Sequence, residues 1–161
     1  MDLRALAAAY TTEDRMSDET NNVAVLTEAY RRWAESKGAS GDYWVSLFAE
    51  NIRFGSIAEP LNAVAYMASY RSRDDLGQYF AGITRDWEML EYRVDHFVAQ
   101  GDRVVMLGHC SWRSKQSGTV VSTPKVDSWR FSDGKAVEFY EYFDTAQVML
   151  AMAPAPAPAP A

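Results

Sequence analysis

The sequence is poor in cysteine and has no long apolar run. Cys110 is the only cysteine among 161 residues, which excludes an internal disulfide and favours a reducing compartment. No apolar run approaches the roughly 18 residues that a membrane span requires. The first residues also lack a basic segment followed by an apolar stretch, as a secretory signal would have. We therefore expect a soluble, cytoplasmic protein without a membrane partner.

Positive charge and cofactor motifs are also scarce. The formal net charge is −6, so the chain lacks the basic footprint of a nucleic-acid-binding protein. The two histidines, His96 and His109, and the single cysteine do not follow metal-ligand spacing, and we expect no metal. Neither GxGxxG nor GxxxxGK[ST] occurs, which leaves dinucleotide and P-loop sites without support. We expect no cofactor.

Apolar and aromatic residues are abundant, at 48% and 13% of the chain. This composition predicts one folded domain with a real core. We place that domain at residues 20–152, after a flexible N-terminal extension over residues 1–19. Residues 153–161 form an Ala-Pro repeat, which excludes helix and sheet and predicts a disordered tail.

The first half of the domain has helical periodicity. A long helix is expected over residues 21–37, because its apolar residues recur at one-face spacing: Val23, Leu26, Tyr30 and Trp33. A short helix follows from Asp42, and residues 51–57 are typical of a short strand. Residues 58–71 are ambiguous. A third helix is expected after Ser72, which can cap it, with a stripe of Leu76, Tyr79, Phe80 and Ile83.

After Asp86 the apolar pattern changes to period two. Turn signals separate four expected strands, over residues 87–99, 103–116, 119–131 and 135–144. A last short helix is expected over residues 145–152. Helices followed by an antiparallel meander predict the α+β class.

The inner face of the expected sheet contains three ionisable residues, Lys125, Asp127 and Glu141. Pairing Val98 with Val104 puts Tyr92, His96 and Cys110 on that face, and a two-residue Ser117-Gly118 loop sets Cys110 opposite Lys125. The last hairpin has two solutions. A two-residue Asp133-Gly134 loop would turn Glu138 inward, whereas a three-residue loop from Ser132 would turn Glu141 inward, opposite Lys125. We choose the second, since its inner face is more apolar.

This charged group has two interpretations. Lys125 and Glu141 form a structural ion pair, or the three residues form a working site, because charges on an apolar wall are costly to desolvate and tend to cluster where chemistry occurs. Similar alternatives apply to His96, which is more often a core or rim residue than a catalyst, and to Cys110, which is more often an inert buried thiol. The tryptophans Trp33, Trp44, Trp112 and Trp129 are core or pocket lining, and they suit a flat, ring-bearing ligand.

The order of elements, with the motif DxWRFxDGKxxEFxEYFD over residues 127–144, resembles the SnoaL-like branch of the nuclear transport factor two superfamily. Ketosteroid isomerases, limonene epoxide hydrolases and polyketide cyclases share this fold. The resemblance covers about residues 20–150. It implies a cone-shaped α+β barrel, with a curved antiparallel sheet wrapped around the N-terminal helices, an internal ligand cavity and a homodimer.

The resemblance also implies roles for single residues. By motif, Tyr30 and Asp127 fall on the two residues with which ketosteroid isomerases stabilise a dienolate, and Ser56 stands at the place of their base. Relative to the epoxide hydrolases, Phe54, Ser56 and Glu141 fall on the water-holding positions, Cys110 on the general acid and Gly108 on the arginine beside it. Glu141 can also supply the carboxylate that polyketide cyclases use.

Our leading hypothesis is a cofactor-independent acid/base enzyme of the isomerase, cyclase, dehydratase or hydrolase type, acting on a small hydrophobic, cyclic molecule. The expected catalytic residues are Tyr30, Asp127 and Glu141. The expected substrate-binding residues are Trp33, Phe54, Ser56, Tyr92, His96, Cys110, Trp112, Lys125, Trp129 and Phe139. Two alternatives remain: a non-enzymatic binder of a small hydrophobic ligand, and a domain whose value lies in dimerisation.

Overall fold

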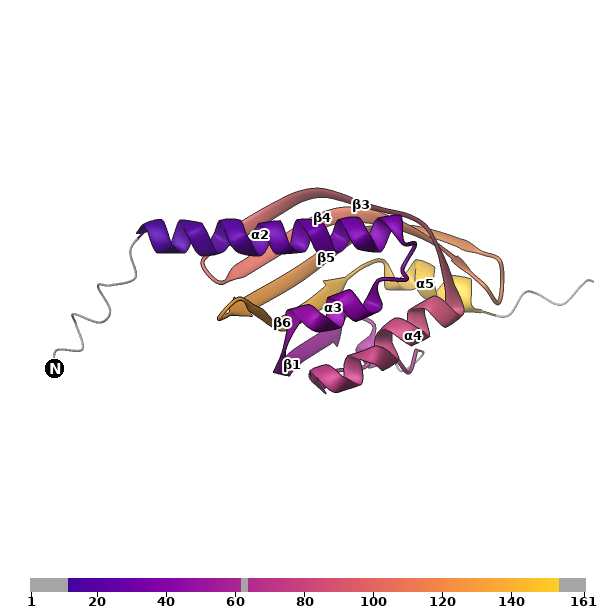
Figure 1. The fold of residues 1–161 in the computed structure, drawn as a ribbon. Coiled ribbons are helices and arrows are strands. Elements are labelled where there is room, and N and C mark those ends of the chain that lie inside the picture. The colour runs from indigo at the N-terminus through magenta and orange to yellow at the C-terminus, as the bar shows by residue number, and fades with distance from the viewer. Residues whose placement is uncertain (1–11, 62–63, 154–161) are drawn as a thin grey trace, which may run out of the picture.

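The computed structural model describes residues 12–61 and 64–153 (Figure 1). Its helices and strands, in chain order, are α2 (Thr12–Glu35), α3 (Gly41–Leu47), β1 (Phe48–Ser56), the 3-10 turn η1 (Glu59–Leu61), β2 (Tyr70–Ser72), the 3-10 turn η2 (Arg73–Asp75), α4 (Leu76–Asp86), β3 (Trp87–Gln100), β4 (Arg103–Ser114), β5 (Val120–Ser132), β6 (Lys135–Tyr142) and α5 (Thr145–Met152). The α+β class and the expected order of elements are confirmed. Within the described residues, no helix has the length and apolar character needed to cross a membrane.

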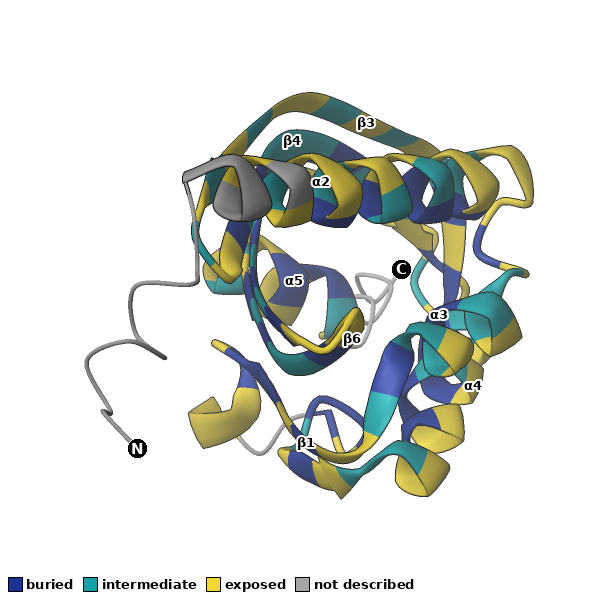
Figure 2. Cartoon of the chain, turned by 60° about the vertical axis from the view of Figure 1, so that its left-hand side comes forward, coloured by how far each residue is buried: buried dark blue, intermediate teal, exposed yellow. Residues whose placement is uncertain are grey.

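The strands form one curved sheet in the order β2-β1-β6-β5-β4-β3. It is mixed rather than wholly antiparallel, because β1 pairs with β6 in parallel. Figure 2 shows the sheet curling from β3 to β1 as an open cone, with α2 along one side and α3 and α4 across another. The meander keeps β4, β5 and β6 adjacent, so that their inner faces form one continuous wall.

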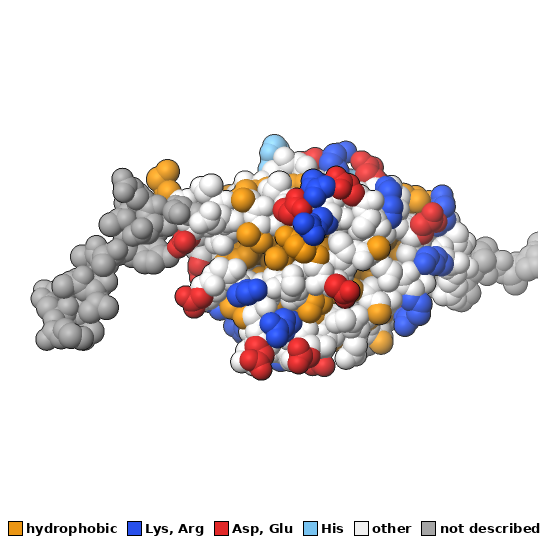
Figure 3. Space-filling model, viewed as in Figure 1, with side chains coloured by type: hydrophobic (Ala, Val, Ile, Leu, Met, Phe, Trp, Pro, Cys, Tyr) orange, Lys and Arg blue, Asp and Glu red, His pale blue; other side chains and the backbone are white. Residues whose placement is uncertain are grey.

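The helix α2 packs its apolar stripe against the sheet. Leu26, Tyr30 and Trp33 are buried, and the opposite face of the helix holds Arg31 and Arg32 in ion pairs with Glu28. Figure 3 shows Lys or Arg and Asp or Glu side chains (blue and red) gathered on this side of the molecule, above a band of hydrophobic side chains. This division into an apolar and a charged face is what the helical period of the sequence predicts.

The helix α2 is longer than expected. It begins at Thr12, so residues 12–19 are helical rather than part of an extension. The polar residues there are compatible with a helix, since the segment contains neither proline nor glycine. Glu19 also accepts a hydrogen bond from the backbone N of Gly101, at 2.5 Å, which ties this end of the helix to the β3–β4 turn. The rest of the expected extension, residues 1–11, and most of the Ala-Pro tail, residues 154–161, lie outside the described residues.

The β4–β5 register differs from the expected one by two residues. Cys110 lies opposite Thr123 and Gly108 opposite Lys125, because the connection is longer than Ser117-Gly118 and the backbone N of Ser114 donates to the Thr119 carbonyl oxygen. A shift of two residues keeps each side chain on its face. The inward direction of Lys125 and Asp127 is therefore retained, although their expected cross-strand partners were wrong.

The β5–β6 hairpin contains two deviations that cancel. The loop is the two-residue one, with Ser132 paired to Lys135 and positive φ at Asp133 and Gly134 (50° and 73°), as in a type I′ turn. The expected three-residue loop was wrong. A register shift between Arg130 and Phe131 then adds one unpaired residue to β6, which reverses the face to which the following side chains point. Glu141 therefore faces inward, opposite Asp127.

The strand β3 was assigned the wrong inner face near its end. Two register shifts, between Met89 and Glu91 and between Val94 and His96, change which residues point inward. Trp87, Met89, Tyr92 and Phe97 face the core, whereas His96 and Val98 are exposed. Bulges of this kind are seen in the pairing with the partner strand and cannot be located from the alternation of one strand alone.

Candidate functional site

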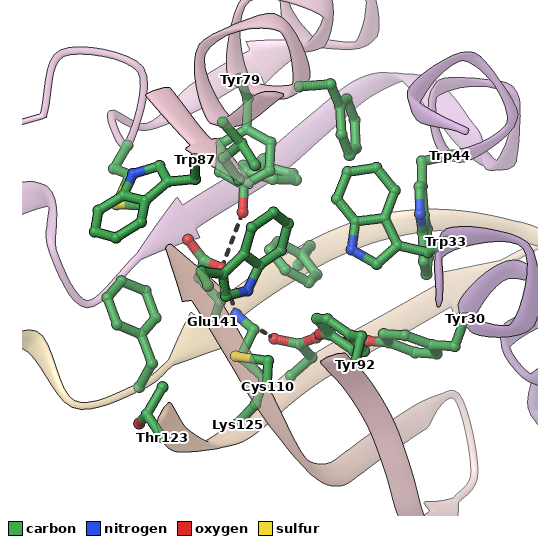
Figure 4. Close-up of a pocket in the computed structure, with 18 of the residues that line it drawn as sticks. Tyr30, Trp33, Trp44, Tyr79, Trp87, Tyr92, Cys110, Thr123, Lys125 and Glu141 are labelled. Atoms are coloured by element: carbon green, nitrogen blue, oxygen red, sulfur yellow. Dashed lines mark hydrogen bonds and ion pairs between the residues drawn. The ribbon is translucent and has the colours of Figure 1, made fainter. Parts of the chain in front are cut away.

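An aromatic cavity lies between the helices and the inner wall of the sheet (Figure 4). It contains about 820 Å³ of empty space, including the part open to solvent. All five tryptophans of the chain line it. The aromatic lining residues are Tyr30, Trp33, Trp44, Phe48, Phe54, Tyr79, Phe80, Trp87, Tyr92, Trp112, Trp129, Phe139 and Phe143.

Lys125 contacts both carboxylates that line this cavity, those of Asp127 and Glu141. Its ammonium group lies 3.0 Å from Asp127 Oδ1 and donates a short hydrogen bond to Glu141 Oε2. Side-chain exposure is only 8% for Lys125, 3% for Asp127 and 4% for Glu141. One ammonium thus lies beside two carboxylates away from bulk water and can balance only one of their two negative charges. The ammonium has three N–H donors for these two neighbours.

Asp127 is held from its other side by two tyrosines. Asp127 Oδ2 accepts hydrogen bonds from the hydroxyl groups of Tyr30, at 2.7 Å, and Tyr92, at 3.1 Å. The Tyr30 hydroxyl in turn accepts from Trp129 Nε1 at 3.0 Å. The proton of Tyr30 therefore points at Asp127 rather than into the cavity.

Glu141 is anchored by one oxygen only. Its Oε2 accepts from Lys125 and from the Tyr79 hydroxyl, at 2.9 Å, as the dashed lines in Figure 4 show. Its Oε1 is buried and has no hydrogen-bond partner among the described residues. Leaving a buried carboxylate oxygen unpaired is costly, which makes Oε1 the atom of the site that is best placed to accept a proton or a hydrogen bond from a ligand.

Burial and charge shift the ionisation of these groups in different directions. Burial raises the pKa of Asp127, against the lowering effect of the adjacent Lys125 ammonium. Burial lowers the pKa of Lys125, but Asp127 and Glu141 outweigh this, and the net pKa is raised, so the lysine stays charged. The pKa values of the Tyr30, Tyr79 and Tyr92 hydroxyls are raised well above 10, first by burial, and these groups stay protonated donors.

Most of the residues that the sequence singled out meet at this cavity. The three expected catalytic residues, Tyr30, Asp127 and Glu141, line it in one hydrogen-bonded group with Lys125. The expected binding residues that also line it are Trp33, Phe54, Tyr92, Cys110, Trp112, Lys125, Trp129 and Phe139.

Two expected binding residues do not reach the cavity. Ser56 is fully buried, but its hydroxyl accepts from the backbone N of Ala58 at 3.2 Å, at the end of β1. His96 is exposed and lines a separate surface groove, because the register shift in β3 turns it outward. Ser56 is the cross-strand partner of Glu141 in the β1–β6 pairing, but it does not line the cavity.

Several lining residues were missed. Tyr79, whose hydroxyl donates to Glu141, lies on the apolar stripe that the sequence predicts for the third helix. Periodicity predicts that the stripe is buried, but it does not show which of its residues contacts the charged cluster. Trp87 begins β3, Thr123 lies within β5 and Phe143 follows β6, and all three line the cavity. The alternation that turns Glu141 inward also turns Phe143 inward, but Phe143 was not among the expected binding residues. The Phe143 ring lies 5.2 Å from Lys125 Nζ, close enough for a cation–π contact.

Cys110 lines the cavity but is not an activated thiol. Burial raises the pKa of Cys110 to about 11, against the lowering effect of Lys125. A thiol with such a pKa is protonated at neutral pH and is a weak nucleophile. Among the described residues, no three His, Cys, Asp or Glu side chains form a group that could hold a metal ion.

An open α+β cone with a buried acid/base cluster inside defines the class of protein. The chain belongs to the SnoaL-like domain family, which matches residues 26–139. No curated protein matches the sequence.

Solved structures of the same fold extend over most of the chain. A nuclear transport factor two-like protein of unknown function from Burkholderia pseudomallei has a TM-score of 0.72 and 22% identity, covering 83% of this chain and 98% of its own. TerC, co-crystallised with polyporic acid, has a TM-score of 0.69 and 20% identity, covering 81% and 97%. A protein from Jannaschia sp. whose structure is described as that of a SnoaL-like polyketide cyclase has a TM-score of 0.69 and 18% identity, covering 86% and 95%. At these identities the likeness concerns the fold.

Proposed function

We propose that the protein is a cofactor-independent acid/base enzyme that removes a proton beside the carbonyl group of a small, ring-bearing substrate. The observation that carries the proposal is the oxygen Glu141 Oε1, which belongs to a residue that lines the cavity, is buried and has no hydrogen-bond partner among the described residues. A fixed carboxylate with one oxygen left open is suited to act as a general base.

The reaction would use the two oxygens of Glu141 differently. Oε2 stays fixed by Tyr79 and Lys125, while Oε1 takes the proton from the substrate carbon. The electron pair of the broken C–H bond moves into the ring system and places negative charge on the carbonyl oxygen. When Glu141 returns the proton to a different carbon, the product is an isomer; return to the same carbon gives only hydrogen exchange. In a ring closure, the enolate carbon would instead bond to a second carbonyl carbon of the substrate, whose oxygen takes the electron pair of the C=O bond and then the proton from Glu141.

Lys125 is the residue that can stabilise the developing negative charge. It is charged, buried and left with one N–H beyond those directed at Asp127 and Glu141. In a site with little water, a fixed ammonium beside an oxyanion is worth much more than in solution. Asp127, bonded by Tyr30 and Tyr92, positions the ammonium between the two carboxylates.

The cavity wall favours a flat, unsaturated substrate. Aromatic rings surround the space on several sides, for example the stacked pair Trp44 and Trp129, 5.4 Å apart, and polar groups gather in a single cluster. Two of the similar structures are consistent with a ring-bearing substrate: one holds polyporic acid and another is named as a polyketide cyclase.

The proposal can be tested without knowing the natural substrate. Proton removal next to a carbonyl exchanges that hydrogen for deuterium in D₂O, which NMR detects in a panel of one-ring and two-ring cyclic ketones. Glu141→Gln should slow the protein-catalysed exchange by about 10²- to 10⁴-fold, the usual contribution of a general base. Glu138→Gln, three positions away on the outer face, is the matched control and should retain the wild-type rate.

Binding must be measured beside exchange. A ketone that changes the tryptophan emission of the wild type occupies the cavity, because all five tryptophans line it. If such a ketone exchanged no faster with the wild type than with Glu141→Gln, the catalytic proposal would be wrong.

One observation favours a second candidate, a non-enzymatic binder. Asp127, Lys125, Glu141 and three tyrosines already bond to one another, as expected for a cluster with a structural role. A binder would hold ring-bearing ligands with similar affinity in the wild type and in Glu141→Gln, and would show no exchange in either protein.

A further inference from the structure

A second hollow shares a wall with the cavity. A groove on the surface runs between α2 and β3, and its lining includes Tyr30, Arg31 and Ala34 of the helix and Tyr92 and His96 of the strand. Tyr30 and Tyr92 also line the interior cavity. Their rings are stacked, 5.8 Å apart with an angle of 20° between the planes. One layer of two phenol rings therefore separates the groove from the charged cluster.

The two tyrosines are held very differently. The Tyr30 hydroxyl donates to Asp127 at 2.7 Å and accepts from Trp129 at 3.0 Å, and the residue lies in the middle of the long helix α2, with 3% of its surface exposed. Among the described residues, the Tyr92 hydroxyl makes one hydrogen bond, to the same Asp127 oxygen, at 3.1 Å. Tyr92 is also partly exposed. Of the two rings, Tyr92 is the one that can leave its place at small cost.

The backbone around Tyr92 is also the least constrained part of the wall. The strand β3 is an edge strand, and register shifts interrupt its pairing with β4 on both sides of Tyr92. An edge strand has a single hydrogen-bonded neighbour, and bulges weaken the ladder locally. Tyr30, by contrast, is fixed by a helix that contacts both β3 and β4.

We infer that Tyr92 controls ligand access to the cavity, and that the groove between α2 and β3 is the entrance. Rotation of the Tyr92 side chain breaks its bond to Asp127 and opens the wall between groove and cavity. When the ring returns, its hydroxyl again caps the Asp127 oxygen and closes the cluster to water. This inference rests on the cavity being the ligand site of the proposed function, but not on the reaction that takes place there.

The tryptophans provide a direct test of access. Because all of them line the cavity, quenching of their emission by acrylamide, a small neutral solute, measures how often the cavity opens. Tyr92→Phe removes one hydrogen bond and keeps the ring, and it should raise the quenching constant by up to about fivefold, the change expected when one hydrogen bond of ordinary strength is lost from the closed state. Tyr92→Leu, which also removes the ring, should raise it further.

Filling the groove tests the route itself. Ala34 lines the groove but not the cavity. Ala34→Phe alone should therefore lower the quenching constant below that of the wild type, and Ala34→Phe added to Tyr92→Phe should cancel the increase that Tyr92→Phe causes. Ala24→Phe, at an exposed position of α2 that does not line the groove, is the matched control and should change neither value. Unchanged quenching in Ala34→Phe, with folding verified by circular dichroism, would overturn the inference and place the entrance elsewhere, for example beside Phe143.

The two proposals fail separately. Quenching requires no turnover, so a loss of exchange activity in every ketone tested would leave the access result intact. Conversely, unchanged quenching in Ala34→Phe would overturn the access inference but would not affect the comparison of exchange rates between Glu141→Gln and the wild type.

Discussion

The strands β5 and β6 bear two ionic clusters, one on each face of the sheet. The inner cluster joins Lys125 to Asp127 and Glu141. The outer cluster gathers arginines around Glu138, which lies 2.9 Å from Arg130 and 3.5 Å from Arg53 and from Arg103. Period-two alternation alone separates the two clusters, because residues along a strand point to opposite faces in turn.

The clusters contain similar groups in different surroundings. In the inner cluster no side chain exposes more than 8% of its surface, whereas Arg53 exposes 70% and Arg103 56%. Surface ion pairs are screened by water and contribute little, while a buried charge without its partner is very unfavourable. The comparison teaches that contact geometry does not decide the energetic weight of an ion pair; its distance from solvent does.

The largest effect is expected when the inner cluster loses its cation. Lys125→Met leaves two buried carboxylates uncompensated and should lower the free energy of unfolding by about 3–5 kcal/mol, as measured by urea denaturation. Lys135→Met is the control, because the Lys135 ammonium donates to the Ser46 carbonyl oxygen at an exposed position. Adding Asp127→Asn and Glu141→Gln to Lys125→Met should recover most of the loss. If Lys125→Met lowered the free energy of unfolding no more than Lys135→Met does, our account of the buried cluster would be wrong.

The second prediction concerns pH: the contributions of Asp127 on the inner face and Glu138 on the outer face to the free energy of unfolding should change in opposite directions as pH rises. Burial raises the pKa of Asp127 above its ordinary value of 3.8, so the folded state holds the proton more tightly and stability falls as pH rises from 3.8 through the raised pKa. The hydrogen bond from Arg130 lowers the pKa of Glu138 below 4.5, so its contribution is present above pH 4.5 and is lost as pH falls through the lowered pKa.

Difference measurements isolate these two groups. The stability of the wild type minus that of Asp127→Asn should decrease as pH rises across its window. The same difference for Glu138→Gln should increase across its own. Urea midpoints at a series of pH values measure both, and slopes of the same sign would refute the opposite environments that we assign to the two carboxylates.

The smallest effect is expected on the outer face. Glu138→Gln should change the free energy of unfolding by no more than about 1 kcal/mol, and this change should shrink at high salt, which screens exposed charges. Chemical denaturation by urea at low and high sodium chloride provides the measurement. A large, salt-independent loss would show that the outer cluster behaves as a buried one.

The elements and their faces could be predicted from the sequence to a large degree. Turn residues and alternation placed β3 to β6 within a few residues of their observed bounds, and α5 has the expected residues, 145–152. The inward direction of Lys125, Asp127 and Glu141 could also be predicted, because charged residues within an otherwise apolar alternation are conspicuous. These features depend on local pattern, which one sequence contains.

Cross-strand partners could not be predicted in the same way. The Lys125 register depended on the length of one loop, and the inner face of β3 depended on two bulges, one of which turned His96 outward. Bulges arise from how neighbouring strands twist and pack, which single-sequence alternation does not record. The contact between Tyr79 and Glu141 likewise depends on how α4 lies across the sheet.

The bulge in the β5–β6 hairpin has one further consequence. The tight turn at Asp133 and Gly134 and the register shift beyond Arg130 together separate the tip of the hairpin from the face on which Glu141 lies. The tip can thus be treated as a replaceable module: a peptide tag, a reporter or a new pair of termini can be engineered there, while the orientation of Glu141 remains set by the strand beyond the bulge.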